Sequence, residues 1–398
     1  MPIDVELWNL VQENKARIIR YLLNEFDPSC GSDEPIYDSE GGWSYARFER
    51  WLVNTGVTVW PRLDSGQLDV SGDAFKLMYH VPGIEGLHAL RDSLGVIVRA
   101  RIPIGRDGRN RPSLFPFGTA SGRNAHGKSL FNAHAGMRSF MLFPEDVTGV
   151  YLDWRTQEVA VAAAYCGDRQ LIDDYSGGDV YHALAIMCGL TDDPDPVRWK
   201  EREPAQRARM KPLQLGINYG MVVPSLARGL DRHPLIASCI IERHRYRCPR
   251  FWEWREDQAW SAMVNRRAVS KYGWPMHITT SPNRRTLYNF PMQSGGAEML
   301  RIAAWRMTEA GIVPSMLVHD GILIEARSQE EVDQAIEIMR IAGLQVCGGL
   351  EVGVDIDQGK GMVRGQRFRD KRPMAKKMWA AMMRALQEVG ALPWGEIP

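Results

Sequence analysis

The stretch MLVHDGILIEA, residues 316–326, sets two apolar runs on either side of Asp320 and Gly321. An Asp-Gly pair between apolar runs predicts a β-hairpin with a two-residue turn, because glycine readily adopts the left-handed backbone conformation that such a turn requires. Residues 148–152 form another apolar run, which predicts a strand that ends at Asp153. If these strands pair in one sheet, the carboxylates of Asp153 and Asp320 come together at the strand ends.

Most of the remaining chain is patterned as helix, with apolar residues recurring at helical spacing. The predicted helices cover residues 5–24, 43–54, 158–165, 204–219, 292–310, 329–342 and 374–389, and a further strand covers residues 350–355. Pro212 lies inside the fourth helix and removes a backbone N–H, which predicts a kink or a helix in two pieces. Residues 103–138 are rich in Gly, Pro and Arg and are expected to form loops and short strands. Helices around a few strands indicate an α+β fold.

The composition of the 398-residue chain excludes several classes of protein. Apolar residues make up 44% and charged residues 24%, which permits a sizeable core and argues against disorder. No apolar run approaches the roughly 18 residues of a membrane span, and the N-terminus lacks a signal-peptide pattern. The six cysteines form no C-x-x-C pair, which argues against a disulfide framework or a zinc site. We expect a soluble, intracellular protein with no membrane partner.

The net charge is only +1, but the basic residues gather in two segments. Residues 99–128 contain seven Lys or Arg and one acid, and residues 360–377 contain eight and one. Runs of this kind are usually solvated faces, and they also suit contact with a phosphate backbone. The charge pattern therefore permits a nucleic-acid partner without requiring one.

The two carboxylates at strand ends have a chemical and a structural interpretation. Carboxylates held close together repel each other, and a pair of divalent cations keeps both ionised. Two-metal sites clamp the attacking and leaving oxygens in phosphoryl transfer. In the structural interpretation, Asp153 caps a helix and Asp320 is a turn residue beside glycine. These two residues alone favour the structural interpretation.

The predicted helix 204–219 changes this balance. Four residues spaced four apart form one slowly drifting stripe along it: Arg207, Lys211, Leu215 and Tyr219. Two cations suit the phosphates of a nucleoside triphosphate, and the apolar and aromatic groups that follow suit its sugar and base. A plain surface helix also carries Arg and Lys four apart, but that explanation leaves the glycines after Leu215 and Tyr219 unexplained.

Five segments, taken in order, resemble the motifs of family A DNA polymerases, the bacterial DNA polymerase I superfamily. DWRTQEVAVAAAYCGD (153–168) resembles the first palm motif, RARMKPLQLGINYG (207–220) the fingers motif, and VHDGILIE (318–325) the His-Asp motif. GTASGR (118–123) and RTLYNFPMQSGGAEML (285–300) resemble two further segments of that family. Each motif is weak alone, and the ordered set over about residues 100–360 is specific.

The resemblance implies a right-hand polymerase fold of α+β class, with an antiparallel-sheet palm, helical fingers and a reduced helical thumb. The expected division is a thumb-like region at 1–100, palm at 101–180, fingers at 181–284, palm again at 285–365, and a basic C-terminal helix at 366–398. The chain resembles a polymerase module alone. The resemblance implies a phage- or mobile-element-like protein in the cytoplasm of a bacterial or phage-infected cell. The Asp4-Val5-Glu6 triplet lacks the partners of an exonuclease site, so no 3′–5′ proofreading is expected.

The resemblance also implies roles for individual residues. The ligands of two Mg²⁺ ions, for which Mn²⁺ can substitute, would be Asp153, Asp320 and the backbone carbonyl of Trp154. The nucleotide-binding residues would be Glu158, Arg207, Lys211, Leu215 and Tyr219. The primer–template contacts would be Arg123, Arg285, Asn289, Gln293 and His319. Lys211 would also act as a catalytic residue beside the two aspartates, by protonating the leaving pyrophosphate.

Some positions depart from the family pattern. Leu215 stands where the family has an aromatic residue, Pro212 is unexpected in its helix, and Gly321 replaces a glutamate after His-Asp. The phosphate-contacting histidine of the family aligns with either Tyr181 or His182. These departures affect sugar selection and rate more than the reaction itself.

The function implied is template-directed DNA synthesis: two-metal-ion transfer of deoxynucleotides from dNTPs to the 3′ end of a primer–template DNA. Glu158, hydrogen-bonded by Tyr219, would pack near the incoming sugar and reject a 2′-hydroxyl. The alternatives are a single-subunit RNA polymerase or primase-like enzyme, and a non-catalytic protein that binds primer–template. The resemblance does not identify any replication or nuclease protein as a partner.

Overall fold

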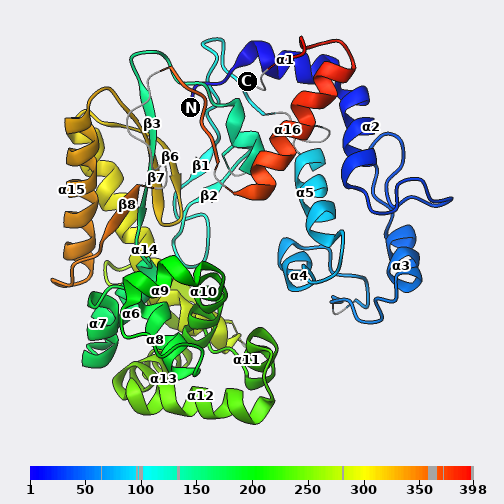
Figure 1. Cartoon of the computed structure of the whole chain (residues 1–398). Coiled ribbons are helices and arrows are strands. Elements are labelled where there is room, and N and C mark those ends of the chain that lie inside the picture. The colour runs from blue at the N-terminus through cyan, green and yellow to red at the C-terminus, as the bar shows by residue number, and fades with distance from the viewer. Residues whose placement is uncertain are drawn as a thin grey trace. The chain divides into compact units, whose positions relative to one another are not determined.

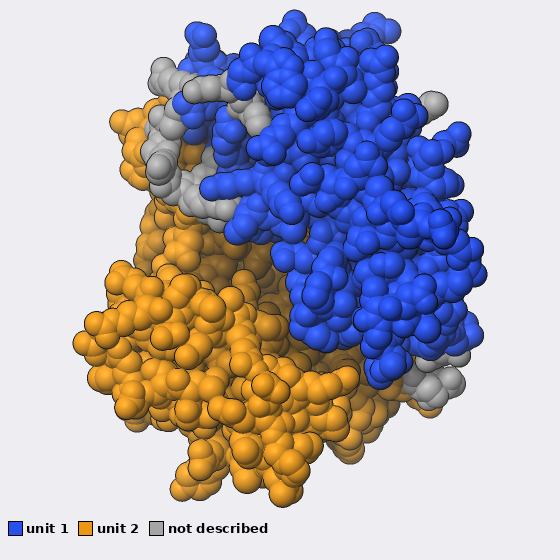
Figure 2. Space-filling model, turned by 45° about the vertical axis from the view of Figure 1, so that its right-hand side comes forward, with its two compact units in different colours: residues 1–113, 126–149, 360–398 blue, residues 114–125, 150–359 orange. Residues whose placement is uncertain are grey.

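The computed structural model of the chain describes residues 1–63, 65–95, 97, 102–131, 135–279, 282–356, 365–370 and 372–395. Five residues of the two basic segments lie outside this part: Arg99, Arg101, Lys360, Arg364 and Lys371. The chain forms two compact units (Figure 2). Unit 1 contains residues 1–113, 126–149 and 360–398, and unit 2 contains residues 114–125 and 150–359. No helix in the described part is long and apolar enough to cross a membrane.

A four-stranded sheet forms the centre of unit 2. Its strands are β6 (Val313–Val318), β7 (Gly321–Ala326), β3 (Thr148–Trp154) and β8 (Val354–Ile356), in that order across the sheet. The β6–β7 hairpin is antiparallel with Val318 opposite Gly321, so the predicted hairpin is confirmed. The predicted Asp320-Gly321 turn is wrong, because His319 and Asp320 form the turn, with His319 in the left-handed conformation, and Gly321 begins β7. Two predicted bounds are wrong, because β3 continues through Asp153 to Trp154 and β8 begins at Val354 rather than residue 350.

The helices α14 (Arg284–Glu309) and α15 (Gln329–Val346) pack against this sheet and lie beside its strands in Figure 1. The helix α6 (Gln157–Cys166) packs on α14 and shares a hydrophobic core with the strands. The prediction that α14 begins at residue 292 is wrong, since it begins eight residues earlier and contains Pro291. Close packing of α14 against α6 explains why α14 continues as one helix through Pro291. A Cβ on Gly295 would lie 2.7 Å from Val161, and one on Gly296 would meet Gln157.

The other helices of unit 2 are α7 (Arg169–Ser176), α8 (Val180–Met187), α9 (Pro196–Arg202), α10 (Pro204–Asn218), α11 (Val223–Leu230), α12 (Pro234–Arg247) and α13 (Pro249–Val264). The last five each have proline in their first turn, where its missing N–H has no helical partner to lose. α10 is one helix through Pro212, so the predicted division into two pieces is wrong. Its Met210, Leu213 and Ile217 are buried in a core shared with these neighbours.

Short strands and the helices of unit 1 complete the fold. The strands are β1 (Leu114–Phe115), β2 (Ala125–His126), β4 (Arg267–Val269) and β5 (Pro275–His277). The helices are α1 (Val5–Glu13), α2 (Lys15–Phe26), α3 (Tyr45–Asn54), α4 (Gly72–Leu77), α5 (Ile84–Leu94), η2 (Ala135–Phe140) and α16 (Pro373–Glu388). The helix predicted over residues 5–24 is two helices, because Asn14 ends α1 and its side chain donates to the Leu10 carbonyl.

Candidate active site

Asp153 and Asp320 lie at adjacent ends of neighbouring strands. The backbone N–H of Trp154, at the end of β3, donates to the carbonyl oxygen of Asp320 in the β6–β7 turn at 3.0 Å. Both aspartates are half-buried, and the preceding His319 has a φ of 48°, in the left-handed region. The predicted meeting of the two strand ends is confirmed.

The oxygen donors at these strand ends suit Mg²⁺, which commonly takes one or two protein carboxylates and completes its shell with water and substrate phosphates. In the described part of the chain there is no group of three or more His, Cys, Asp or Glu side chains that could hold a metal by itself. Two carboxylates and a backbone carbonyl therefore fit ions that are shared with a phosphate ligand.

Glu158, in the first turn of α6, forms an ion pair with Arg123. The side chains are only 14% and 17% exposed, so the pair is shielded from water. Burial raises the pKa of Glu158 above its ordinary value, and the Asp320 charge adds to the rise, whereas Arg123 and Lys211 oppose it. In the described part of the chain, the Glu158 carboxylate accepts a hydrogen bond from Arg123 and not from the predicted partner Tyr219.

The segment that carries Arg123 is held through its backbone. Arg301 Nη1 donates to the Gly122 carbonyl at 2.7 Å, and the indole N–H of Trp274 donates to the Ala120 carbonyl at 3.3 Å. Gly122 has a φ of +75°, and a Cβ there would lie 2.9 Å from the Trp274 ring. Trp274 and Arg301 are not identifiable from the sequence, because side chains that bind main-chain carbonyls belong to no motif.

Arg207 and Lys211 lie on α10, which the stripe predicted. Arg207 forms an ion pair with Asp179 and lies over the ring of Tyr181, 5.0 Å from its centroid. Lys211 is exposed. Asp179 is the N-cap of α8, where its carboxylate accepts from the Tyr181 N–H at 3.0 Å. No motif in the sequence marks Asp179 as the acidic partner of Arg207.

The structure separates the two residues that align with the family histidine. Burial raises the pKa of Tyr181 to about 12. The charge of Arg207 lowers this pKa, and the charge of Asp320 raises it. His182 instead makes a 2.7 Å hydrogen bond through Nε2 with the Asp193 carbonyl and is buried. Tyr181 is therefore the residue on the Arg207 side of α8.

The remaining nucleotide-binding candidates, Leu215 and Tyr219, are half-buried against the helical core of unit 2. The two adjacent glycines have close neighbours, as the sequence led us to expect. A Cβ on Gly216 would meet Met221, and one on Gly220, whose φ is +80°, would lie 2.8 Å from Tyr288. These contacts fix the C-terminal end of α10.

Asn289 and Gln293 line one cavity of about 230 Å³ together with Thr119 and Ser121. They lie on α14 rather than on a loop, and Asn289 Oδ1 is buried with no hydrogen-bond partner among the residues described. Arg285 is exposed near the start of the same helix. The cavity therefore brings two predicted primer–template residues beside the segment that carries Arg123.

A sequence model of DNA polymerase family A matches residues 126–362, more than half of the chain. The chain belongs to this family. DNA polymerase I of Aquifex aeolicus is 25% identical over 271 residues, which cover 63% of this family A chain and 45% of that protein. The thermostable DNA polymerase I of Thermus aquaticus is 25% identical over 225 residues, covering 52% of this chain and 26% of that protein. The chain thus spans less than half the length of these relatives.

The fold is also that of a solved family A structure. The POL domain of Pol1 from M. smegmatis, in complex with DNA primer-template and dNTP, matches with a TM-score of 0.68 and 20% sequence identity. The match covers 89% of this chain and 66% of that one. The α+β fold class predicted from the motifs is confirmed, and the residues before 126 lie outside the family match.

Proposed function

We propose that this chain is a DNA-directed DNA polymerase that extends a primer 3′ end with deoxynucleotides. The observation that carries the proposal is the backbone hydrogen bond from the Trp154 N–H to the Asp320 carbonyl, which joins the end of β3, where Asp153 lies, to the β6–β7 turn that contains Asp320. Membership of family A supports the proposal, and so do the two cationic residues Arg207 and Lys211 on α10. The relatives compared are named DNA polymerase I, and the matched structure contains primer-template and dNTP.

The reaction would join the primer 3′-oxygen to the α-phosphorus of a dNTP and break the bond to the β-phosphate. Asp153, Asp320 and the Trp154 carbonyl would hold two Mg²⁺ ions, or Mn²⁺ in their place, which when bound activate the hydroxyl and offset phosphate charge. Lys211 is exposed and can donate a proton to the departing pyrophosphate. Arg207 would exchange Asp179 for a phosphate oxygen, which makes triphosphate binding an ion-pair exchange.

Sugar and template contacts would come from the other site residues. Glu158, which is paired with Arg123, would occupy the volume of a 2′-hydroxyl. Leu215 and Tyr219, which pack against the helical core of unit 2, would lie beside the sugar and base. The residues that contact primer–template would be Arg123, Arg285, Asn289, Gln293 and His319. We propose that the sheet and its helices form the palm, that residues 181–284 form the fingers, and that residues 1–100 and 366–398 act as a thumb with its C-terminal helix. We also propose that this chain lacks 3′–5′ proofreading.

Primer extension by the purified chain tests the function, with Mg²⁺ and either dNTPs or NTPs. Extension with dNTPs is the expected result. Extension with NTPs alone would support an RNA polymerase. Binding of primer–template without any extension would support a non-catalytic scaffold. Asp153→Asn and Asp320→Asn should each lower the rate about a thousandfold, equivalent to about 4 kcal/mol. Asp355→Asn is the matched control, since Asp355 lies opposite Asp153 in β8 and pairs with Arg155. Full activity in the two site variants would refute the metal assignment.

A further inference from the structure

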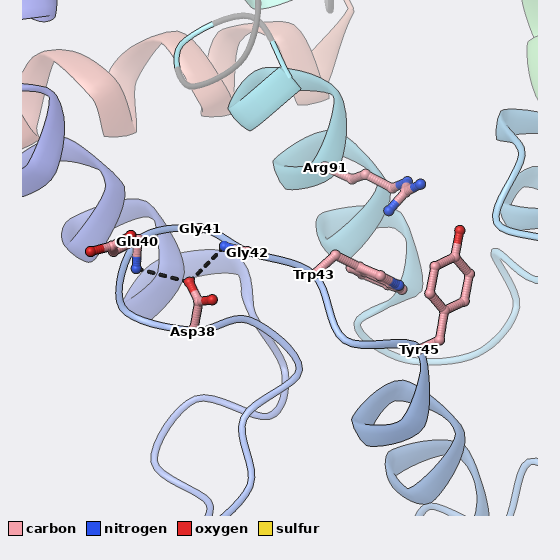
Figure 3. Close-up of a pocket in the computed structure, with 7 residues that line it drawn as sticks. All are labelled: Asp38, Glu40, Gly41, Gly42, Trp43, Tyr45 and Arg91. Atoms are coloured by element: carbon pink, nitrogen blue, oxygen red, sulfur yellow. Dashed lines mark hydrogen bonds between the residues drawn. The ribbon is translucent and has the colours of Figure 1, made fainter.

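The pocket drawn in Figure 3 has no charge that selects a ligand. It has a volume of about 350 Å³, lies in unit 1, and is lined by residues of the loop 38–45 and by Arg91 of α5. Asp38 Oδ1 accepts from the N–H groups of Glu40 at 3.0 Å and Gly42 at 2.7 Å, and Figure 3 shows both bonds within the loop. The lining sets two carboxylates against one guanidinium, so it favours neither an anion nor a cation.

A close contact beside Asp320 in unit 2 is more specific. Gly321 follows Asp320 and begins β7, and its φ lies outside the left-handed region, so its backbone conformation does not require glycine. Space requires glycine instead, because a Cβ on this residue would overlap the hydroxyl of Tyr151 and lie 2.9 Å from Cε2 of the same ring. The three atoms nearest to that Cβ all belong to Tyr151. The phenol of Tyr151 therefore occupies the place of a side chain at position 321.

Tyr151 lies on the same face of the sheet as Asp153. Both residues belong to β3 and are two positions apart, and alternate residues of a strand point to the same face. Leu152 and Trp154 point the other way, into the hydrophobic core that the sheet shares with its helices. Tyr151 is only 8% exposed, so its ring is packed in place and moves away from Gly321 only at the cost of that packing.

Two contacts from β3 thus act on the peptide unit that joins Asp320 to Gly321. The N–H of Trp154 donates to the Asp320 carbonyl at 3.0 Å, and the phenol of Tyr151 packs on the residue that follows. One contact fixes the peptide oxygen and the other limits rotation of the backbone after it. Groups that orient a metal ligand affect metal binding without touching the metal.

We propose that Tyr151 is a positioning residue of the candidate active site, which fixes the Asp320–Gly321 peptide so that the carboxylates of Asp320 and Asp153 share metal ions. The inference rests on the proposed function, because it takes the two aspartates as metal ligands. It also accounts for the glycine that replaces a glutamate after His-Asp, since the phenol and a side chain at position 321 need the same space.

The test measures Mn²⁺ binding to the full chain by the EPR signal of the free ion. A primer–template with a dideoxy 3′ end and the matching dNTP are present, so the site is complete and no turnover occurs. Tyr151→Ala should raise the Kd for Mn²⁺ about tenfold, the lower end of the loss that follows removal of a group that orients a metal ligand. Tyr151→Phe keeps the ring against Gly321 and should bind Mn²⁺ as the wild type does.

Gly321→Ala tests the contact from its other side. In the wild-type background the new methyl group displaces the Tyr151 ring and should weaken Mn²⁺ binding. In the Tyr151→Ala background the atoms that it would meet are gone, so it should have no further effect, and the double variant should show this coupling. Gly343→Ala is the matched control, because its Cβ would lie 3.0 Å from Val352 in the core of unit 2. It should lower the melting midpoint and leave the Kd for Mn²⁺ unchanged.

Four results would overturn the proposal. They are an unchanged Kd in Tyr151→Ala, an equal loss in Tyr151→Phe, additive effects of Tyr151→Ala and Gly321→Ala, and a comparable loss in the Gly343→Ala control. Melting of each variant is recorded, so that a folding defect is not mistaken for a loss of metal. A failed polymerase assignment is distinguishable, because wild type would then bind no more Mn²⁺ than Asp153→Asn does, which would refute the proposed function together with this inference.

Discussion

Replacement of Arg123 by methionine should destabilise unit 2 in a pH-dependent way. The variant leaves Glu158 mostly buried and without its cation, and loss of that cation raises the pKa of Glu158 further. A carboxyl group whose folded pKa exceeds its unfolded value contributes most below the unfolded pKa, and this contribution is lost as the pH rises toward the folded pKa. The variant should therefore be closest to wild type in acid.

The size of the effect follows from the two responses open to Glu158. Protonation against an unfolded pKa of about 4.3 requires about 1.36 kcal/mol per pH unit, which gives about 1 kcal/mol at pH 5 and about 5 kcal/mol at pH 8. Remaining ionised after loss of a buried partner costs about 3–5 kcal/mol. The lower of the two applies, so the deficit grows from about 1 kcal/mol at pH 5 to about 3–5 kcal/mol at pH 8.

Thermal unfolding at pH 5, 6.5 and 8 measures this deficit. With about 2–4 °C per kcal/mol for a unit of this size, the midpoint should fall by a few degrees at pH 5 and by at least about 6 °C at pH 8. Arg155→Met is the matched control, because its ion pair with Asp355 is about half exposed and should contribute at most about 1 kcal/mol. Equal losses for Arg123→Met at pH 5 and pH 8 would refute the reasoning.

Three further outcomes are expected. Wild-type kcat/KM should favour dATP over ATP opposite template T by about 10²–10³, and Glu158→Ala should reduce this ratio, so equal use of both nucleotides by the wild type would rule out the sugar gate. Pure protein with Mg²⁺ and no dNTPs should leave a mismatched, labelled primer at full length; metal-dependent shortening would reveal an exonuclease. Burial lowers the pKa of His244 to about 4, so stability should be lost as the pH falls from about 6.5 toward 4, and melts of His244→Gln should show a weaker loss over that range.

The local part of the site was predictable from sequence, and the long-range part was not. The hairpin at Asp320 and the stripe from Arg207 to Tyr219 follow from turn chemistry and helical spacing within short segments. The pairs that complete the site join residues far apart: Arg123 with Glu158, and Arg207 with Asp179. No spacing rule relates such residues, because tertiary packing alone sets their distance.

Proline shows where local rules fail in this chain. Pro212 indicated an interruption, and Pro291 lies directly before the predicted start of its helix, yet α10 and α14 continue through these prolines. Each proline removes one backbone hydrogen bond, and burial of residues such as Met210 on α10 and Met299 on α14 outweighs that loss. Neither effect can be weighed before the packing partners are known.

The segment before Arg123 is bound through its main-chain carbonyls, which determines the positions in it that tolerate substitution. Because Arg301 and Trp274 hold carbonyl oxygens, which every amino acid possesses, exchange of the Ala120 side chain leaves those anchors available. Gly122 lacks that freedom, since any side chain there meets the Trp274 ring. A library aimed at nucleotide selectivity can therefore vary position 120, which lines the cavity of Asn289 and Gln293, without removing these anchors. Positions 274 and 301 would adjust Glu158 indirectly, through the segment that carries Arg123.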